Sequence, residues 1–326
     1  MRGLPLIIPI MLVSFVTIGL ARVKTIGVVV LFSLLYIYGY SRGTRIGGNL
    51  GSISMGDDVR LGYLGLFIAG VIILVQILKI GSVPLLNPSI RSMLNPKLTM
   101  LTYLLGVPSS VYLLLNGRKL GLLYPVIISL YAYRTPVLVS VIAISLVYLQ
   151  KLEKRNVVLV LTLGVIAFLA LSFVRTGLNF LVRVQGTTSV LDVIVKRCSL
   201  LGFYKGKLQM AGITSYLWGG FGPRMMISRY LGVHDVTTTA TLIGGMYLDF
   251  GMLAGLEMLL LGFYYGLLEN VHSNLGRTLY YSTLAYGIVG VETGLLDLPV
   301  YVLFLLGILV FWREKNVSVR KIIPWI

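Results

Sequence analysis

Long apolar runs constrain this chain more than any other feature of its sequence. A transmembrane helix needs about 20 mostly apolar residues, with about 17 as a lower limit. Of the 326 residues, 57% are hydrophobic and only 12% are charged, about half the charged fraction of an ordinary soluble domain. The sequence therefore predicts an all-α fold, a polytopic transmembrane helical bundle with about ten spans. The expected spans are 4–20, 25–40, 62–80, 98–115, 119–133, 136–150, 156–174, 241–267, 278–294 and 296–312.

The orientation of the spans follows from the basic residues in the short loops. If the N-terminus lies in the cytoplasm, the inner short loops hold most of the Lys and Arg residues, as the positive-inside rule requires. We therefore expect a multi-pass protein of the plasma membrane with both termini cytoplasmic. Residues 1–174 would form the first seven spans, 175–240 a large, partly helical extracytoplasmic loop, and 241–326 the last three spans and a tail. No small-residue cleavage site follows the first run, which we interpret as a span.

The formal net charge of +17 fits a membrane partner better than a nucleic acid. Anionic lipid headgroups and the positive-inside bias account for it, and no base-reading motif is present. The single cysteine, Cys198, excludes an internal disulfide and a multi-cysteine metal site. The two histidines, His234 and His272, form no HxxxH pair. We therefore expect no metal site and no cofactor.

The segment 175–240 is the most polar part of the chain. It runs directly into an apolar stretch that carries two acids, Asp249 and Glu257. Charged groups within a membrane span mark functional sites, and a basic surface attracts anions. This pattern favours a site for an anionic substrate at the membrane surface. The basic residues of the segment are Arg175, Arg183, Lys196, Arg197, Lys205, Lys207, Arg224 and Arg229.

Three arginines near the expected outer face are candidate anion ligands. Pro136 fixes a turn beside Arg134, which could bind a phosphate or a sugar carboxylate. Arg175 and Arg183 are eight residues apart and would share roughly one face of a helix. Guanidinium groups clamp a diphosphate bidentately, as an ammonium group cannot. The alternative for all three is a side chain that anchors the chain to lipid headgroups.

Further candidates follow the rigid turn Gly222-Pro223. Arg224 comes directly after this turn and Arg229 lies five positions later, so both could bind substrate. His234 could act as a general base with Asp235 orienting it, although an exposed loop histidine is the commoner case. We expect short helices at 189–201 and 225–231 in this loop.

Asp249 and Glu257 lie eight residues apart in the expected span 241–267. A carboxylate inside a membrane needs a partner or a water-filled cavity, because burying it unpaired is costly. Asp249 is about two turns from the loop and is the better candidate for a catalytic residue. Glu257 lies deeper, and we expect it to pair with a basic or polar residue.

The residues from about 130 to 270 resemble a known family. Arg134 opens a span that ends in basic residues, Pro223-Arg224 lies in the large loop, and Tyr247, Phe250, Gly251 and Gly255 precede Leu261-Gly262. This order resembles the oligosaccharide repeat-unit polymerases of the O-antigen polymerase and ligase superfamily. The family form Y-x-x-F-G-x-x-G has one residue fewer before its last glycine than this chain has.

The resemblance implies a metal-independent glycosyltransferase on the outer face of the membrane. Its partners would be polyprenyl-diphosphate-linked glycans, membrane lipids and other polysaccharide-assembly proteins. Arg134, Arg175 and Arg224 would bind diphosphates, with Arg183, Arg229 and Tyr247 as further substrate-binding residues. The catalytic candidates are Asp249 and His234. Ligases of the superfamily have a histidine shortly before this helix, where the chain has Thr238-Thr239-Ala240, so the polymerase is favoured over the ligase.

Other function classes remain open at this point. A lipid-linked oligosaccharide flippase or a solute carrier also needs basic pockets and intramembrane acids, but no internal repeat is evident. A structural scaffold would leave the loop arginines and Asp249 unexplained.

Overall fold

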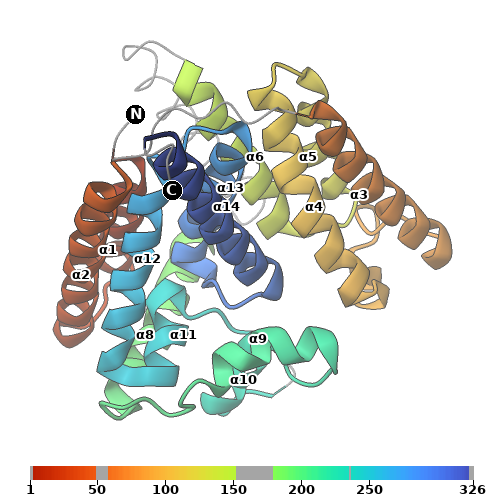
Figure 1. The fold of residues 1–326 in the computed structure, drawn as a ribbon. Coiled ribbons are helices and arrows are strands. Elements are labelled where there is room, and N and C mark those ends of the chain that lie inside the picture. Colours follow the sequence, from red (N-terminus) through yellow and green to blue (C-terminus); the bar gives the residue numbers. More distant parts are fainter. Residues whose placement is uncertain (1–2, 49–57, 152–178, 235, 323–326) are drawn as a thin grey trace. The chain divides into compact units, whose positions relative to one another are not determined.

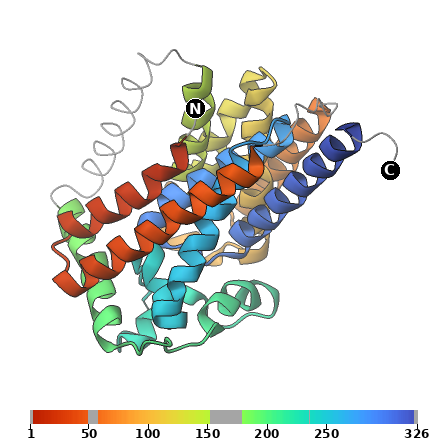
Figure 2. The same ribbon diagram turned by 60° about the vertical axis from the view of Figure 1, so that its left-hand side comes forward.

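The computed structural model describes residues 3–48, 58–151, 179–234 and 236–322, and within these ranges every regular element is a helix (Figures 1 and 2). Four helical stretches are long and apolar enough to cross a membrane. They are α2 (Val23–Gly47), α3 (Val59–Ile80), α4 (Pro96–Leu115) and the combined stretch Thr241–Leu268. The all-helical membrane fold is thus confirmed for the described residues, whereas the count of about ten spans stays a prediction.

Shorter or less apolar helices occupy most of the other expected spans. The run expected at 156–174 lies outside the described residues. The remaining helices at expected spans are η1 (Leu4–Leu6) with α1 (Ile7–Ile18), η3 (Lys119–Leu123) with α5 (Tyr124–Ser129), α6 (Arg134–Lys151), α13 (Asn274–Thr293) and α14 (Leu298–Ile322).

The basic segment, residues 175–240, contains the predicted short helices. It holds α8 (Asn179–Arg197), α9 (Lys207–Leu217) and α10 (Pro223–Tyr230). The prediction for 225–231 is met by α10, and α8 covers most of 189–201 with Lys196 and Arg197 exposed at its end. Between α9 and α10, Gly219 and Gly220 have positive φ angles, as the glycine-rich turn predicts.

The chain divides into two compact units, each assembled from separated stretches of sequence. The first unit comprises Met1–Gly43, Tyr148–Gly266 and Gly287–Leu296. The second comprises Thr44–Val147, Leu267–Tyr286 and Asp297–Ile326.

Glycines bring the helices of the first unit into close contact. A Cβ atom on Gly262 would lie 2.0 Å from the carbonyl oxygen of Tyr36 in α2, and one on Gly39 would lie 2.0 Å from that of Leu259. In a membrane, where lipid is as apolar as the helices, such close backbone packing supplies much of the association energy. This packing holds the helical stretch that ends at Leu268 against α2, and that stretch carries Asp249 and Glu257.

The second unit is built around the antiparallel pair α3 and α4. Gly62 and Gly65 of α3 let Leu113 and Ser109 of α4 approach closely. A buried acid holds another part of this unit together. Glu314 of α14 accepts hydrogen bonds from the His272 amide (3.2 Å) and the Ser273 hydroxyl, just before α13 begins.

Candidate functional site

A break in a membrane-length helix is the centre of the site. The expected span 241–267 is not one continuous helix, because α11 (Thr241–Phe250) ends and a 3₁₀ turn, η4 (Gly251–Leu253), separates it from α12 (Ala254–Leu268). Gly251 has φ 57° and ψ −130°, a conformation that L side chains rarely adopt. A Cβ atom there would also lie 2.3 Å from the carbonyl oxygen of Leu200. Glycine is therefore required at the break.

The stretch that joins α8 to α9 is hydrogen-bonded to the backbone at the break. A helix that ends exposes carbonyl oxygens, and within a membrane these need new donors. The joining stretch supplies three backbone amides: Phe203 and Tyr204 donate to Leu248 (2.8 and 3.1 Å), and Lys205 donates to Asp249 (2.9 Å). In return, the amide of Met252 donates to the carbonyl oxygen of Leu200 (2.9 Å).

The side chain of Asp249 caps the N-terminus of α9, which lies about 40 residues earlier in the sequence. Asp249 is fully buried at 0% exposure. One carboxylate oxygen accepts from the amides of Gly206 (3.1 Å) and Leu208 (3.0 Å), and the other accepts from Gln209 (2.8 Å). A negative charge is stabilising at a helix N-terminus, where amides lack partners. Asp249 thus ties the start of α9 to the end of α11.

Glu257 continues this link one turn into α12. The Gln209 side-chain amide donates to both of its carboxylate oxygens, at 2.6 and 2.7 Å. The polar partner expected for Glu257 is therefore present, and it comes from α9. Gln209 of α9 thus bonds to both acids of the broken span, and its neighbour Leu208 bonds to Asp249.

Of two side chains beside the break, Tyr247 is buried and Cys198 is half-buried. Tyr247 is 2% exposed, and its ring lies 6.2 Å from that of Phe32 in α2. The thiol of Cys198 donates to the carbonyl oxygen of Tyr247 at 3.6 Å. Burial raises the pKa of Cys198 above its usual value. Substrate binding by Tyr247 stays a prediction.

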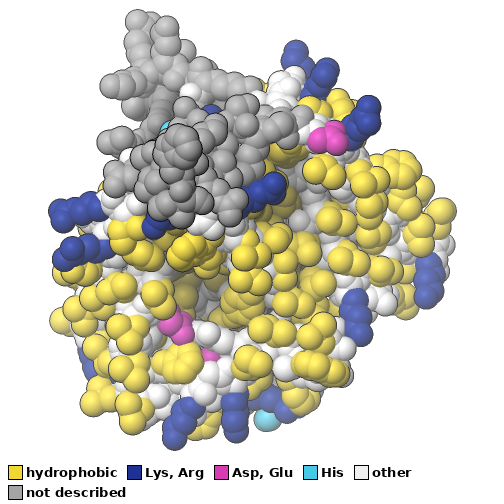
Figure 3. Space-filling model, viewed as in Figure 1, with side chains coloured by type: hydrophobic (Ala, Val, Ile, Leu, Met, Phe, Trp, Pro, Cys, Tyr) yellow, Lys and Arg dark blue, Asp and Glu magenta, His cyan; other side chains and the backbone are white. Residues whose placement is uncertain are grey.

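The basic helix α10 follows α9 and carries two of the candidate arginines. Arg224 is half-buried in its first turn, while Arg229 is exposed with its guanidinium carbon 3.4 Å from the centre of the Phe221 ring. The Tyr204 hydroxyl donates to the carbonyl oxygen of Met226 at 3.1 Å, which links α10 to the stretch between α8 and α9. Figure 3 shows Lys and Arg side chains where Figure 1 places α9 and α10. His234 is exposed shortly after α10.

The other candidate residues make none of the contacts described above. Arg183 of α8 forms an ion pair with Glu292 of α13 at 2.6 Å. Arg134 begins α6 in the second unit. Arg175 lies outside the described residues. The convergence of Arg134, Arg175 and Arg224 on one cavity therefore stays a prediction.

Sequence reasoning missed the residues that connect the basic segment to the break. Gly202 has a positive φ of 82°, and a Cβ atom on it would lie 2.0 Å from the carbonyl oxygen of Asp249. Gly206 also has a positive φ and directly precedes α9. The two closely spaced glycines before α9 were the available signal, and no sequence signal pointed to Gln209. In the part of the chain that the structure describes, no three His, Cys, Asp or Glu side chains gather as metal ligands would.

Comparison of the sequence with known proteins gives a family for this chain. The model of the family described as "Putative O-antigen polymerase" matches residues 1–304. An uncharacterized protein of Methanocaldococcus jannaschii is 28% identical over 308 residues, which cover 86% of each chain. No solved structure matches.

Proposed function

Because the chain belongs to this family of O-antigen polymerases, we propose that it is a membrane glycosyltransferase that polymerises polyprenyl-diphosphate-linked oligosaccharide repeat units. The reaction would take place on the outer face of the plasma membrane, where we place the segment 175–240. The substrates are two lipid-linked glycans, one donor and one acceptor. Other polysaccharide-assembly proteins would supply and remove them.

The observation that carries this proposal is the attachment of the basic segment to a broken membrane helix. Asp249 holds the N-terminus of α9 through three amides, and α10 with Arg224 and Arg229 follows in the same segment. A lipid-linked diphosphate lies at the level of the headgroups, where the end of a membrane helix meets such a loop. Guanidinium groups held there can neutralise the diphosphate as it leaves.

The chemistry needs few groups. An acceptor hydroxyl oxygen bonds to the anomeric carbon of the donor sugar, the bond from that carbon to the diphosphate oxygen breaks, and the hydroxyl loses its proton. We assign the leaving diphosphate to Arg224 and Arg229, with Arg134, Arg175 and Arg183 as further ligands, and we assign the proton to His234. The carboxylate of Asp249 is occupied by three amides, so we assign it the role of positioning the loop.

The proposal predicts that replacing Arg224 by Lys lowers chain lengthening although the charge is kept. A guanidinium fork makes two parallel hydrogen bonds to phosphate oxygens, and an ammonium group cannot reproduce both. Losing one hydrogen bond to a charged group costs about 1.5–3 kcal/mol, which corresponds to roughly a tenfold to hundredfold loss of turnover. The assay is lengthening of a lipid-linked repeat unit by purified protein in EDTA. The matched control is Arg197→Lys, at the exposed end of α8 in the same segment.

Each outcome of the assay decides one part of the proposal. Equal activity of the Arg224 and Arg197 variants would remove Arg224 from substrate binding. An absolute need for added divalent metal would refute the metal-independent mechanism. Unchanged turnover of a His234→Gln variant would exclude His234 as the base. If no lengthening occurs but labelled lipid-linked glycan crosses liposome membranes, the protein is a flippase.

A further inference from the structure

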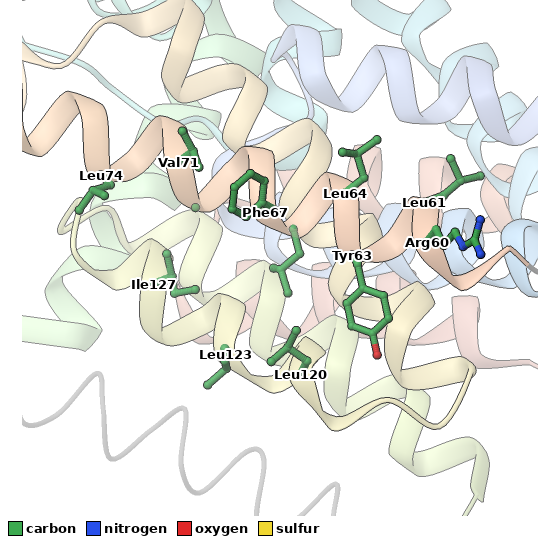
Figure 4. A pocket seen from close by; sticks show the side chains of 12 residues that line it. Arg60, Leu61, Tyr63, Leu64, Phe67, Val71, Leu74, Leu120, Leu123 and Ile127 are labelled. Carbon is green, nitrogen blue, oxygen red and sulfur yellow. The ribbon is translucent and has the colours of Figure 1, made fainter.

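An apolar groove runs along one face of α3 in the second unit. Its volume is about 840 Å³, and η3 and α5 supply its other wall. Figure 4 shows Tyr63 and Leu74 of α3 on the side where Leu120 and Ile127 lie. Gly70 also lines it, and no heavy atom lies within 4 Å of the position of a Cβ atom there. The absence of a side chain at this position widens the groove.

The polar atoms of the groove lie at one end. Among its lining residues, only Arg60 and Tyr63 have polar side-chain groups, and they are three positions apart at the start of α3. The antiparallel packing of α4 on α3 brings Arg118 and Lys119 to the same end, because Leu113 contacts Gly62 and its carbonyl oxygen binds the amide of Arg118.

This end of the groove is positively charged. Arg60, Arg118 and Lys119 are exposed, and none of them makes an ion pair within the described part of the chain. Asp58 is the acid that directly precedes α3, and its carboxylate accepts a hydrogen bond from the amide of Arg60 (3.0 Å). The net balance of these four side chains is positive, which favours an anion.

The length of the groove matches one leaflet of a bilayer. From Tyr63 to Leu74 the helix rises about 16 Å, and the hydrocarbon core of one leaflet is about 15 Å thick. A ligand that fits this groove needs an apolar chain of about that length and an anionic group at the basic end, which are the features of an anionic membrane phospholipid. We propose that this groove is a specific binding site for one anionic lipid of the bilayer. In the topology proposed above, the lipid belongs to the cytoplasmic leaflet.

The phosphate would be held by Arg60, because a guanidinium group binds phosphate oxygens bidentately. Arg118 and Lys119 add charge next to it, and the hydroxyl of Tyr63 can donate to the headgroup. A lipid held in this way differs from the general lipid surrounding a membrane protein, since its affinity depends on the headgroup charge and on the shape of the groove.

The test is native mass spectrometry of the delipidated full-length protein titrated with phosphatidylglycerol or phosphatidylcholine. We expect one phosphatidylglycerol to bind tightly and phosphatidylcholine to bind far more weakly. Replacing Arg60, Arg118 and Lys119 together by Gln should weaken phosphatidylglycerol about fivefold per charge, roughly 100-fold in total. A variant with Arg22, Lys24 and Lys79 replaced by Gln removes the same three charges elsewhere and should bind as the wild type does.

The groove itself is tested by Gly70→Phe, which fills it and should abolish the tight phosphatidylglycerol. Its control is Gly27→Phe, at another helical glycine with no neighbour within 4 Å of its Cβ position. Helical content by circular dichroism confirms that the variants are folded. Equal loss of binding in the two charge variants, or equal affinity for the two lipids, would overturn the proposal. So would displacement of phosphatidylglycerol by a stoichiometric amount of a polyprenyl diphosphate.

Discussion

Asp249 shows how a negative charge is accommodated inside an apolar helix. Its carboxylate makes no ion pair in the described structure but accepts three backbone amides at the start of α9. Glu314 has a similar environment in the second unit, where it accepts the amide of His272 before α13. In both cases the positive end of a helix compensates the buried charge.

Replacing Asp249 by Asn should destabilise the protein by about 1.5–3 kcal/mol, because the amide nitrogen of Asn would face a backbone donor and lose a charged hydrogen bond. Chain lengthening should fall at the same time, since α9 and α10 lose their fixed position. Thermal unfolding in detergent measures the first effect. The control is Asp192→Asn. Asp192 accepts a hydrogen bond from a single backbone amide, that of Arg22, and the remaining side-chain oxygen of Asn can still accept that bond. An Asp249 variant as stable as this control would contradict the capping role.

The thiol of Cys198 should react slowly with an impermeant maleimide near neutral pH. Burial raises its pKa, so less thiolate is present at neutral pH than for a free cysteine, and the rate should rise only at higher pH. Measured rates relative to free cysteine, followed as a function of pH, test this expectation. A rate equal to that of free cysteine at every pH would show that the thiol is not shielded.

At the scale of elements, the break between α11 and α12 depends on Gly251. A Gly251→Ala variant must place a side chain in a conformation that costs about 1–3 kcal/mol, and its Cβ atom would collide with the carbonyl oxygen of Leu200. We expect a lower unfolding temperature and faster proteolysis between α8 and α9. Gly27→Ala, at an open position near the start of α2, should be neutral or slightly stabilising. Equal stability of the two variants would argue that the break tolerates a side chain.

The sequence predicts elements much better than it predicts their contacts. Apolar runs located the four helical stretches that are long enough to span a membrane, because the length of a span is set by the bilayer. The turn at Gly219–Gly220 and the helix after Pro223 followed from local backbone chemistry. The break at Gly251 was not predicted, because hydropathy continues through it from Thr241 to Leu268. The pairs of Asp249 and Glu257 with α9 join residues 40 or more positions apart, and no local pattern encodes such a pairing.

At the scale of the whole molecule, the topology follows from charge alone and is open to a direct test. We expect that a Ser189→Cys, Cys198→Ser protein is labelled by an impermeant maleimide in intact cells, because Ser189 is exposed on α8 in the segment placed outside. A Lys119→Cys, Cys198→Ser protein, with its thiol in an expected cytoplasmic loop, should be labelled only after permeabilisation. The reverse pattern would invert the orientation.

The basic segment is attached at the helix break mostly through main-chain atoms. Phe203, Tyr204, Lys205, Gly206, Leu208 and Gln209 all donate through their backbone amides. Many different side chains can occupy such positions without changing the attachment, provided that the glycines and the acceptor carboxylate remain. A glycan polymerase could therefore acquire a new sugar preference by exchanging side chains in its loop while the membrane helices that carry the loop stay the same.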